Sequence, residues 1–353
     1  MPDSEFRSIL YKFPPETLEP QNLKEIANAK GWKSELSGLL TMPVERDILT
    51  FDTFAILAEL TDHLLSFGGG TLLNWAYARE LPRFSFDIDS QARKLGLEKK
   101  HLLEGSIEAL NQELRQQGKV QSVSYKGRDF EIGTVILDSE KDHFPDVLSL
   151  KRRVYASTCG SPAHTYFKKE AGEWGGSNED LHLKKYYGGR FPNVEDVRIE
   201  IGLPETTAKL FPVQEIKVLP LVYPAVKVAP VTASLTPKEF VMALKVVRLG
   251  KDFKPEELSR AISDLVKALF DLHACSKSCQ PRLISEGIKQ ICSARDLDAI
   301  TIIRKATERT KEMANGKEAK DQFERSGQTS FVAQMVDFDT VISSNLKLLS
   351  KLP

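Results

Sequence analysis

The sequence predicts an α+β fold in which a mixed sheet with helices comes first and a helical domain follows. Strand-like alternation of apolar and polar residues is concentrated between residues 63 and 201, whereas apolar residues recur at helical spacing beyond residue 236. A proline-punctuated stretch, 212–230, separates the two regions, and 353 residues are enough for more than one domain. We therefore expect a helix-and-loop extension over 1–50, an α/β domain over 51–233 and a helical domain over 234–353.

The first elements follow from hydrophobic periodicity. Apolar residues at helical spacing predict a helix over 51–61, and a short buried strand is expected over 63–67. The triple glycine 68–70 predicts a turn, because glycine adopts backbone conformations that other residues avoid. A helix is expected over 71–78. Over 84–89, apolar and polar residues alternate, which predicts a strand with two unlike faces.

The remaining elements are read in the same way. The patterns predict a helix over 95–117, a loop over 163–193, and strands over 120–125, 130–137, 147–155 and 197–201. Thr236 followed by Pro237 predicts a helix start with Thr236 as its cap. From there to the end of the chain we expect almost only helices.

The composition is typical of a globular protein in a reducing compartment. Hydrophobic residues make up 41% of the chain and charged residues 28%. Lys+Arg and Asp+Glu both number 49, so a nucleic-acid partner would require a local basic patch. The four cysteines are sparse, the N-terminus lacks a basic leader with an apolar core, and no apolar run is long enough for a membrane span. A cytoplasmic protein without a membrane segment is expected.

Three weaker signals have simpler interpretations. A possible zinc set, His273, Cys275, Cys279 and Cys292, lacks the usual ligand spacing, which favours core or surface thiols. Bases and aromatics are mixed over 168–191, as in single-strand binding surfaces, but the pattern favours a partly solvated loop. The chain contains no Walker-type phosphate loop, which counts against an ATPase of that class.

Asp87 and Asp89 are the strongest candidates for chemistry. Residues two apart on a strand point to the same face, so both carboxylates project side by side while Ile88 points into the core. Adjacent carboxylates repel unless a cation lies between them or one of them binds a proton. Mg²⁺ suits this position, with Mn²⁺ as an alternative, because Mg²⁺ takes one or two carboxylates and keeps places for water and substrate phosphates.

A glycine turn lies upstream of these aspartates. Gly69, Gly70 and Thr71 at a helix N-terminus let the backbone approach a phosphate and offer it free N–H groups. Ser85, on the expected strand face of the aspartates, can donate to a phosphate oxygen, and Arg83 continues that face outward. A phosphate cradle and a metal pair within about 20 residues predict NTP binding and nucleotidyl transfer.

An isolated Asp-x-Asp pair carries little information. The chain contains two others, Asp296-Leu297-Asp298 and Asp337-Phe338-Asp339, which lie in helical runs without a preceding glycine turn. The simplest interpretation of such a pair is a solvated surface. Only the full combination of glycines, Arg83, Ser85 and the two aspartates is rare enough to predict a site.

This string resembles a known family. Phe67-Gly68-Gly69-Gly70-Thr71-Leu72-Leu73-Asn74 and Arg83-Phe84-Ser85-Phe86-Asp87-Ile88-Asp89 resemble the signature of the AbiEii/AbiGii-type nucleotidyltransferase toxins, within the DNA polymerase β-like superfamily. Leu72 stands where the family usually has alanine. The resemblance covers 65–100 strongly and 234–273 weakly. It implies a polymerase β-like nucleotidyltransferase sheet followed by a helical domain.

Two residues in the helical half match later family motifs. Lys245 follows Ser234-Leu235 as the family's lysine follows its cap, and Asp271 is preceded by Leu269-Phe270, although Ala268 replaces the first aspartate. A lysine suits a triphosphate as a compact charge, unless Lys245 is only a surface lysine of an amphipathic helix. Asp271 could orient Lys245, bind a metal, accept the proton of the incoming hydroxyl, or be a plain surface carboxylate. Glu200 is a third candidate carboxylate, or else an exposed strand residue.

The resemblance implies metal-dependent transfer of an NMP from an NTP to an acceptor hydroxyl. The implied catalytic residues are Asp87, Asp89, Lys245 and Asp271; the nucleotide would be held by Gly69, Gly70, Thr71, Arg83, Ser85 and Lys245, and the metal by Asp87, Asp89 and Glu200. The acceptor would be a tRNA 3′ end, another RNA end or a protein side chain. The partner would be an antitoxin in a toxin–antitoxin or phage-defence pair. The alternatives are an antibiotic-type small-molecule nucleotidyltransferase and a non-catalytic nucleotide-binding module.

Overall fold

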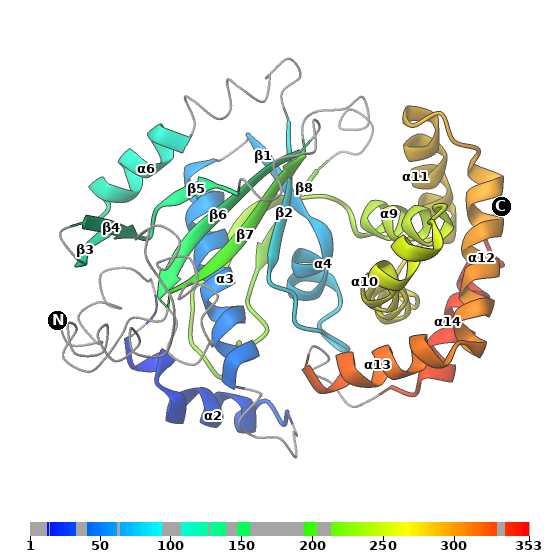
Figure 1. Cartoon of the computed structure of the whole chain (residues 1–353), viewed down its shortest axis with the longest axis horizontal. Helices are drawn as coiled ribbons and strands as arrows, with labels where there is room; N and C mark the ends of the chain where they lie inside the picture. The colour runs from blue at the N-terminus through cyan, green and yellow to red at the C-terminus, as the bar shows by residue number, and fades with distance from the viewer. Residues whose placement is uncertain are drawn as a thin grey trace.

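The computed structural model divides into a lobe built around a sheet and a lobe built from helices (Figure 1). We call these the sheet lobe and the helical lobe. The structure describes residues 13, 15–32, 41–61, 64–93, 107–125, 128–138, 147–155, 194–202, 213–329 and 336–352. The helix expected over 95–117 is described from Ile107 onward as α6 (Ile107–Gln116), and the loop expected over 163–193 lies outside the described residues.

A seven-stranded mixed sheet forms the centre of the sheet lobe. Its strand order is β5–β6–β7–β2–β1–β9–β8, and β3 and β4 form a separate hairpin. The β1–β9 and β2–β7 pairs are parallel, and the other pairs are antiparallel. A mixed sheet with its helices largely gathered in a second lobe is an α+β architecture, which confirms the expected class. The strands are β1 (Leu65–Gly68), β2 (Asp87–Ala92), β3 (Gln121–Tyr125), β4 (Arg128–Ile132), β5 (Val135–Leu137), β6 (Val147–Tyr155), β7 (Val194–Gly202), β8 (Gln214–Val218) and β9 (Val231–Leu235).

One long helix, α3 (Thr41–Leu60), packs on one face of the sheet (Figure 1). Phe54 of α3 meets Phe67 of β1 edge to face, with ring centroids 5.1 Å apart. Ile88 of β2 and Ile199 of β7 are fully buried. Because side chains alternate along a strand, burial of these residues leaves their neighbours at 87, 89 and 200 on the opposite face of the sheet.

Helices account for the regular structure described beyond residue 236, as expected. Their apolar faces form a second hydrophobic core, separate from that of the sheet lobe. Leu73 and Ala78, from the chain just after the glycine turn, belong to this second core. The glycine turn is therefore packed directly against the helical lobe. The helices are α9 (Lys238–Gly250), α10 (Pro255–Cys275), α11 (Pro281–Ala294), α12 (Ala299–Asn315), α13 (Lys317–Thr329) and α14 (Phe338–Leu349).

Three local expectations proved wrong. The single strand expected over 130–137 is two strands, β4 in the separate hairpin and β5 at the edge of the main sheet. The strand expected from residue 84 begins only at Asp87, because the pairing of β2 with β7 starts there and its pairing with β1 starts at Asp89. Thr236 does not cap α9. Pro237 occupies the N-cap position, and the Thr236 amide instead donates to the Phe67 carbonyl at 2.8 Å, which ties the start of α9 to β1.

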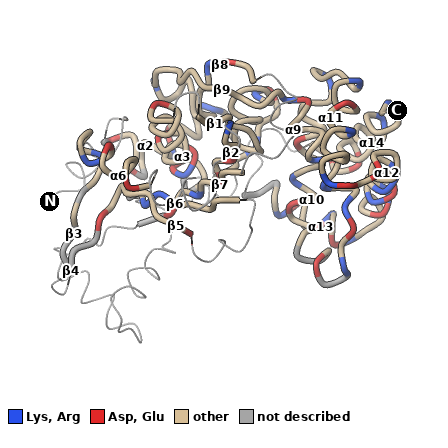
Figure 2. Tube along the Cα trace, turned by 90° about the horizontal axis from the view of Figure 1, so that it is seen from above, with Lys and Arg blue, Asp and Glu red and all other residues tan. Residues whose placement is uncertain are grey.

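Charges of both signs are interspersed over both lobes (Figure 2). This distribution agrees with equal numbers of acidic and basic residues in the chain. Among the described residues, no helix is long and apolar enough to cross a membrane.

Candidate functional site

Strand register brings a third carboxylate to the aspartate pair. Asp89 of β2 lies directly opposite Glu200 of the parallel strand β7, and Asp87 lies opposite Arg198. Partners in register share a sheet face, so these four side chains gather on the face away from α3. Arg198 is exposed and was not singled out from the sequence. The sequence pattern could have identified Arg198, because polar residues alternate with Val197 and Ile199 there. The same alternation places Glu200 on this face of the strand.

The glycine turn is shaped around Asp89. The short helix α4 (Gly69–Leu72) follows β1 directly, and Gly69 has φ +70°, a conformation that side chains rarely adopt. A Cβ at Gly69 would lie only 1.7 Å from the Asp89 Oδ2 atom. The backbone N–H of Gly70 donates a hydrogen bond to the same carboxylate. Glycine is therefore required at 69 first of all to let the Asp89 carboxylate approach the backbone.

Hydrogen bonds hold the glycine turn against the N-terminal end of β2. Thr71 Oγ1 donates to the Asp87 carbonyl at 2.5 Å. Asn74, on the single π-helical turn η2 (Leu73–Tyr77), donates from Nδ2 to the Gly70 carbonyl at 2.7 Å and accepts from the Arg83 amide at 2.7 Å. Asn74 was part of the family string but was given no role. It fixes the turn relative to the segment that carries Arg83 and Ser85.

The space beside Gly70 holds two polar side chains. A Cβ on Gly70 would meet Arg83 Nη2 at 2.5 Å and Ser85 Oγ at 3.1 Å. The Ser85 hydroxyl therefore lies next to the turn, although Ser85 precedes the strand proper. Glycine at 70 leaves room for a guanidinium and a hydroxyl at the start of α4.

The carboxylate cluster repels a negative charge on Asp89. Burial and the neighbouring carboxylates of Asp87 and Glu200 raise the pKa of Asp89 to about 7, against the opposing effects of Lys245 and the Gly70 N–H. Within the described residues, no three His, Cys, Asp or Glu side chains converge as a complete metal site. The donor set is thus a pair of strand aspartates with a nearby glutamate, which suits a cation that brings its own waters and phosphates.

A buried ion-pair triad connects the two lobes. Arg83 Nε and Nη2 donate to the two Asp271 carboxylate oxygens at 2.7 and 2.8 Å. Lys245 Nζ lies 2.6 Å from Asp271 Oδ2. Asp271 is fully buried on α10, Arg83 is 5% exposed and Lys245, on α9, is 15% exposed. Burial opposes ionisation of Asp271, but the two cations outweigh it and hold its pKa below the usual value.

The triad gives two predicted site residues a definite setting. Both oxygens of Asp271 contact cations, so among the sequence interpretations its geometry matches the orienting of Lys245. Arg83 is directed into the interior, where its Nη1 also donates to the Phe84 carbonyl at 3.1 Å. Lys245 and Asp271 lie on different helices and are brought together with Arg83, which precedes Asp271 in the chain by 188 residues.

The remaining sequence candidates have structural roles. Burial raises the pKa of Cys275 to about 12 and of Cys279 to about 11, and Cys279 Sγ donates to the Cys275 carbonyl at 2.8 Å, so both are protonated, packed thiols. The two other Asp-x-Asp pairs lie at helix starts. Asp298 accepts from the Thr301 amide as N-cap of α12, and Asp337 accepts from the Thr340 amide as N-cap of α14.

Comparison with known proteins finds a distant similarity among solved structures. No protein-family model matches the chain, and no curated protein matches it. Among solved structures, MenT4, a nucleotidyltransferase toxin from Mycobacterium tuberculosis H37Rv, is similar at 13% sequence identity. The match covers 94% of this chain and 89% of that chain, with a TM-score of 0.46. At this distance the similarity carries no inference about activity, which has to come from the residues of the site.

Proposed function

We propose that the protein is a nucleotidyltransferase that moves an NMP from an NTP to an acceptor hydroxyl. The observation that carries the proposal is the packing of Asp89 into the glycine turn, beside Asp87 and in register with Glu200. This arrangement concentrates negative charge next to backbone N–H groups and a serine hydroxyl. Such a site suits a cation and a polyphosphate bound together.

The residues present fit a divalent cation. Asp87 and Asp89 would hold Mg²⁺ or Mn²⁺, with Glu200 beside them; burial and then the neighbouring carboxylates raise the pKa of Asp89, and a cation would favour its charged form. When bound, the metal would neutralise phosphate oxygens and so stabilise charge that develops during transfer. Glu200, in register with Asp89, would accept a proton from an incoming hydroxyl that binds near that carboxylate.

Cationic and polar side chains would hold the triphosphate. Ser85 and the start of α4 at Gly70 and Thr71 line one side, and Lys245 supplies a compact positive charge from the helical lobe. Asp271 is a positioning residue in this proposal, because it fixes the Lys245 ammonium. Arg83 acts one step further away, since it holds Asp271 in place by two hydrogen bonds.

The biological role is proposed from the family resemblance alone. The strings 67–74 and 83–89 resemble AbiEii/AbiGii-type toxins of the polymerase β-like superfamily, so we propose an RNA end, such as a tRNA 3′ end, as acceptor. The protein would then act in the cytoplasm as a toxin that is neutralised by a cognate antitoxin.

Incubation with each labelled NTP, Mg²⁺ and total RNA tests the activity directly. We expect label to pass to RNA, and Asp87→Asn and Asp89→Asn each to lower the rate by more than about a hundredfold, because each removes a metal-facing charge. Both variants should fold, since the two side chains are half-buried and Asn is isosteric. Asp296→Asn is the matched control, because it changes an aspartate of another Asp-x-Asp pair away from the site.

The outcomes separate the alternatives. Label on RNA supports the toxin-like activity, and label on a small hydroxylated compound supports the antibiotic-type activity. Wild-type turnover in both variants would contradict the role of the aspartates. Tight NTP binding without transfer to any acceptor would identify a non-catalytic nucleotide-binding module.

A further inference from the structure

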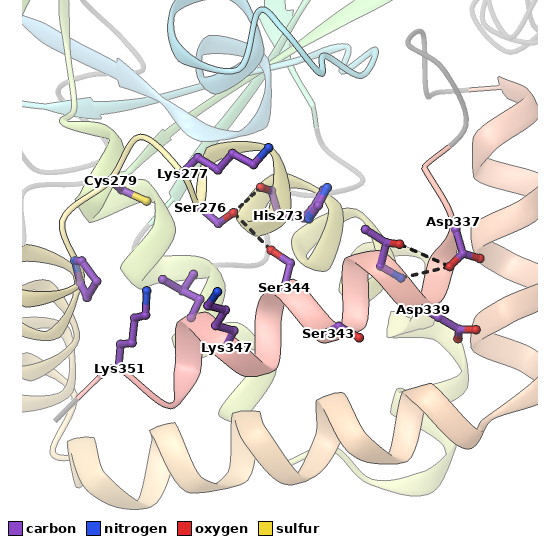
Figure 3. Close-up of a pocket in the computed structure, with 13 residues that line it drawn as sticks. His273, Ser276, Lys277, Cys279, Asp337, Asp339, Ser343, Ser344, Lys347 and Lys351 are labelled. Carbon is purple, nitrogen blue, oxygen red and sulfur yellow. Dashed lines mark hydrogen bonds between the residues drawn. The ribbon is translucent and has the colours of Figure 1, made fainter.

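A groove in the helical lobe lies outside the site described above (Figure 3). It has a volume of about 810 Å³ and lies where the end of α10, the start of α11 and one side of α14 meet. Its lining residues include serines, lysines and a histidine. Its described lining residues include no Phe, Tyr or Trp, so it offers no large aromatic ring on which bases could stack.

The charges of the groove are segregated. Figure 3 shows Lys347 in the last turn of α14 and Lys351 just beyond its end, with Lys277 across from them, whereas Asp337 and Asp339 lie at the start of α14. All three lysines are exposed. The lysines lie on separate turns and elements, so their positive charges are spread out and do not surround one point. This basic end therefore suits a polymer with successive negative charges better than a single anion.

The floor of the basic end contains an unsatisfied polar atom. His273 Nδ1 is buried and has no hydrogen-bond partner among the described residues. Three residues on, Ser276 Oγ donates to the His273 backbone carbonyl at 2.8 Å and lies 3.2 Å from Ser344 Oγ. These two hydroxyls lie together among the groove-lining residues, where they can contact an anion that the lysines attract.

The basic end is connected to the proposed active site by direct contacts. Lys238, in the first turn of α9, donates to the Ser278 carbonyl of the turn that carries Lys277. Two residues earlier, Thr236 Oγ1 would lie 3.2 Å from a Cβ on Gly68, which is the residue before the glycine turn. The start of α9 therefore contacts the glycine turn on one side and the wall of the groove on the other.

We propose that the basic end of this groove binds backbone phosphates of a single-stranded nucleic acid whose end enters the active site. The proposal rests on the proposed function for the identity of the acceptor. The lysines would contact successive phosphates, and the Ser276 and Ser344 hydroxyls would contact their oxygens. Asp337 and Asp339 repel a polyanion, so the strand leaves the groove before the acidic end. Recognition would be independent of base sequence and sensitive to salt.

The test compares two triple variants of the full chain. Lys277→Ala/Lys347→Ala/Lys351→Ala removes the basic end, and Lys311→Ala/Lys317→Ala/Lys320→Ala removes three exposed lysines of α12 and α13 as a control matched in charge. Binding of a labelled single-stranded RNA is measured by fluorescence anisotropy at several salt concentrations. We expect the groove variant to bind at least about tenfold more weakly, with a salt slope smaller by about 2 for three lost phosphate contacts.

Binding of Mg²⁺–NTP and of pyrophosphate, measured in parallel by calorimetry, keeps the two proposals separate. The groove proposal stands if the groove variant loses RNA affinity, the control variant keeps it, and both bind Mg²⁺–NTP as the wild type does. It is overturned if both triple variants bind RNA equally, if the wild type does not bind RNA, or if the groove variant loses pyrophosphate binding instead. Absence of Mg²⁺–NTP binding from all three proteins would contradict the proposed function while leaving the RNA result to decide the groove.

Discussion

Single side chains decide how the two lobes share a site. Lys245 could be found from the sequence because its spacing from Ser234-Leu235 matches a family motif. Its partner Asp271 was found with several roles open, since a short apolar string does not say what a carboxylate faces. The role of Arg83 could not be found, because a strand pattern directed it outward, whereas the structure buries it against a residue 188 positions away.

Removal of the Lys245 ammonium should weaken catalysis without unfolding the protein. Lys245→Ala leaves Asp271 paired with Arg83, so no buried charge is left alone. Loss of one charge-assisted phosphate contact should raise the free energy of the transition state by about 1.5–3 kcal/mol. This change lowers kcat/KM roughly ten- to 150-fold. The assay is transfer kinetics with varied NTP. Lys289→Ala, an exposed lysine of α11, is the matched control.

A double variant checks that Asp271 acts through Lys245. If Asp271 only positions the ammonium, Lys245→Ala/Asp271→Asn should have about the same kcat/KM as Lys245→Ala, because the two effects are not additive. An additional loss in the double variant, in protein shown to be folded, would give Asp271 a separate catalytic role. An unchanged kcat/KM in Lys245→Ala would make this lysine a structural partner of Asp271.

Among the elements, the glycine turn and β2 depend on each other. Gly69→Ala should remove activity, because the new Cβ would displace the Asp89 carboxylate. Gly118→Ala is a close control, since Gly118 has φ +69° and nothing lies within 4 Å of a Cβ there. Both variants should lose about 1–2 kcal/mol of stability through the left-handed backbone. Only Gly69→Ala should also lose transfer, and equal activity of the two would contradict the contact.

A buried carboxylate joins three elements behind the site. Asp47 of α3 accepts from Trp75 Nε1 of η2 at 2.8 Å and from the Leu221 amide at 3.0 Å. Burial raises the pKa of Asp47 to about 6, against a reference value of 3.8. The folded state therefore takes up a proton at this group between about pH 6 and 4, and this contribution to stability grows as the pH falls through that range.

Asp47→Asn should remove this pH dependence. From about pH 7 to 4.5, the wild type should gain about 2 kcal/mol of unfolding free energy relative to the variant. Urea unfolding of both proteins across that range measures the difference, in which the other carboxylates cancel. A difference that stays constant with pH would place the pKa of Asp47 near its ordinary value.

The strands and helices were easier to predict than their pairing. Periodicity located β6, β7 and the second half of α3; the first half of that helix, from Thr41, was assigned to the extension over 1–50. It also extended β2 too far back to residue 84, since alternation persists where no neighbouring strand is available for pairing. The same limit left Glu200 uncertain: only the register of β7 against β2 shows that it lies opposite Asp89. Sequence pattern gives the face of a residue, and the partner strand decides its neighbours.

For the whole molecule, the two lobes are harder to separate than the change in sequence character near residue 233 suggests. The boundary expected near residue 233 falls inside β9, whose residues up to Leu235 pair with β1 and β8. Leu73 and Ala78 of the sheet lobe lie in the core of the helical lobe. A chain cut at the boundary would expose these residues and leave Arg83 buried without Asp271, so cooperation between the lobes has to be tested in the intact protein.

Hydrogen exchange on the intact protein provides that test. If Lys245 and the aspartate face of β2 hold the same nucleotide, Mg²⁺–NTP should increase amide protection in both β1–β2 and α9–α10, because a ligand that bridges two lobes stabilises each against local opening. In Lys245→Ala the added protection should shrink in α9–α10 and persist in β1–β2, since the remaining contacts belong to the sheet lobe. Protection limited to β1–β2 in the wild type would show that the helical lobe takes no part in nucleotide binding. In that case the Arg83–Asp271–Lys245 triad would serve only to hold the two lobes together.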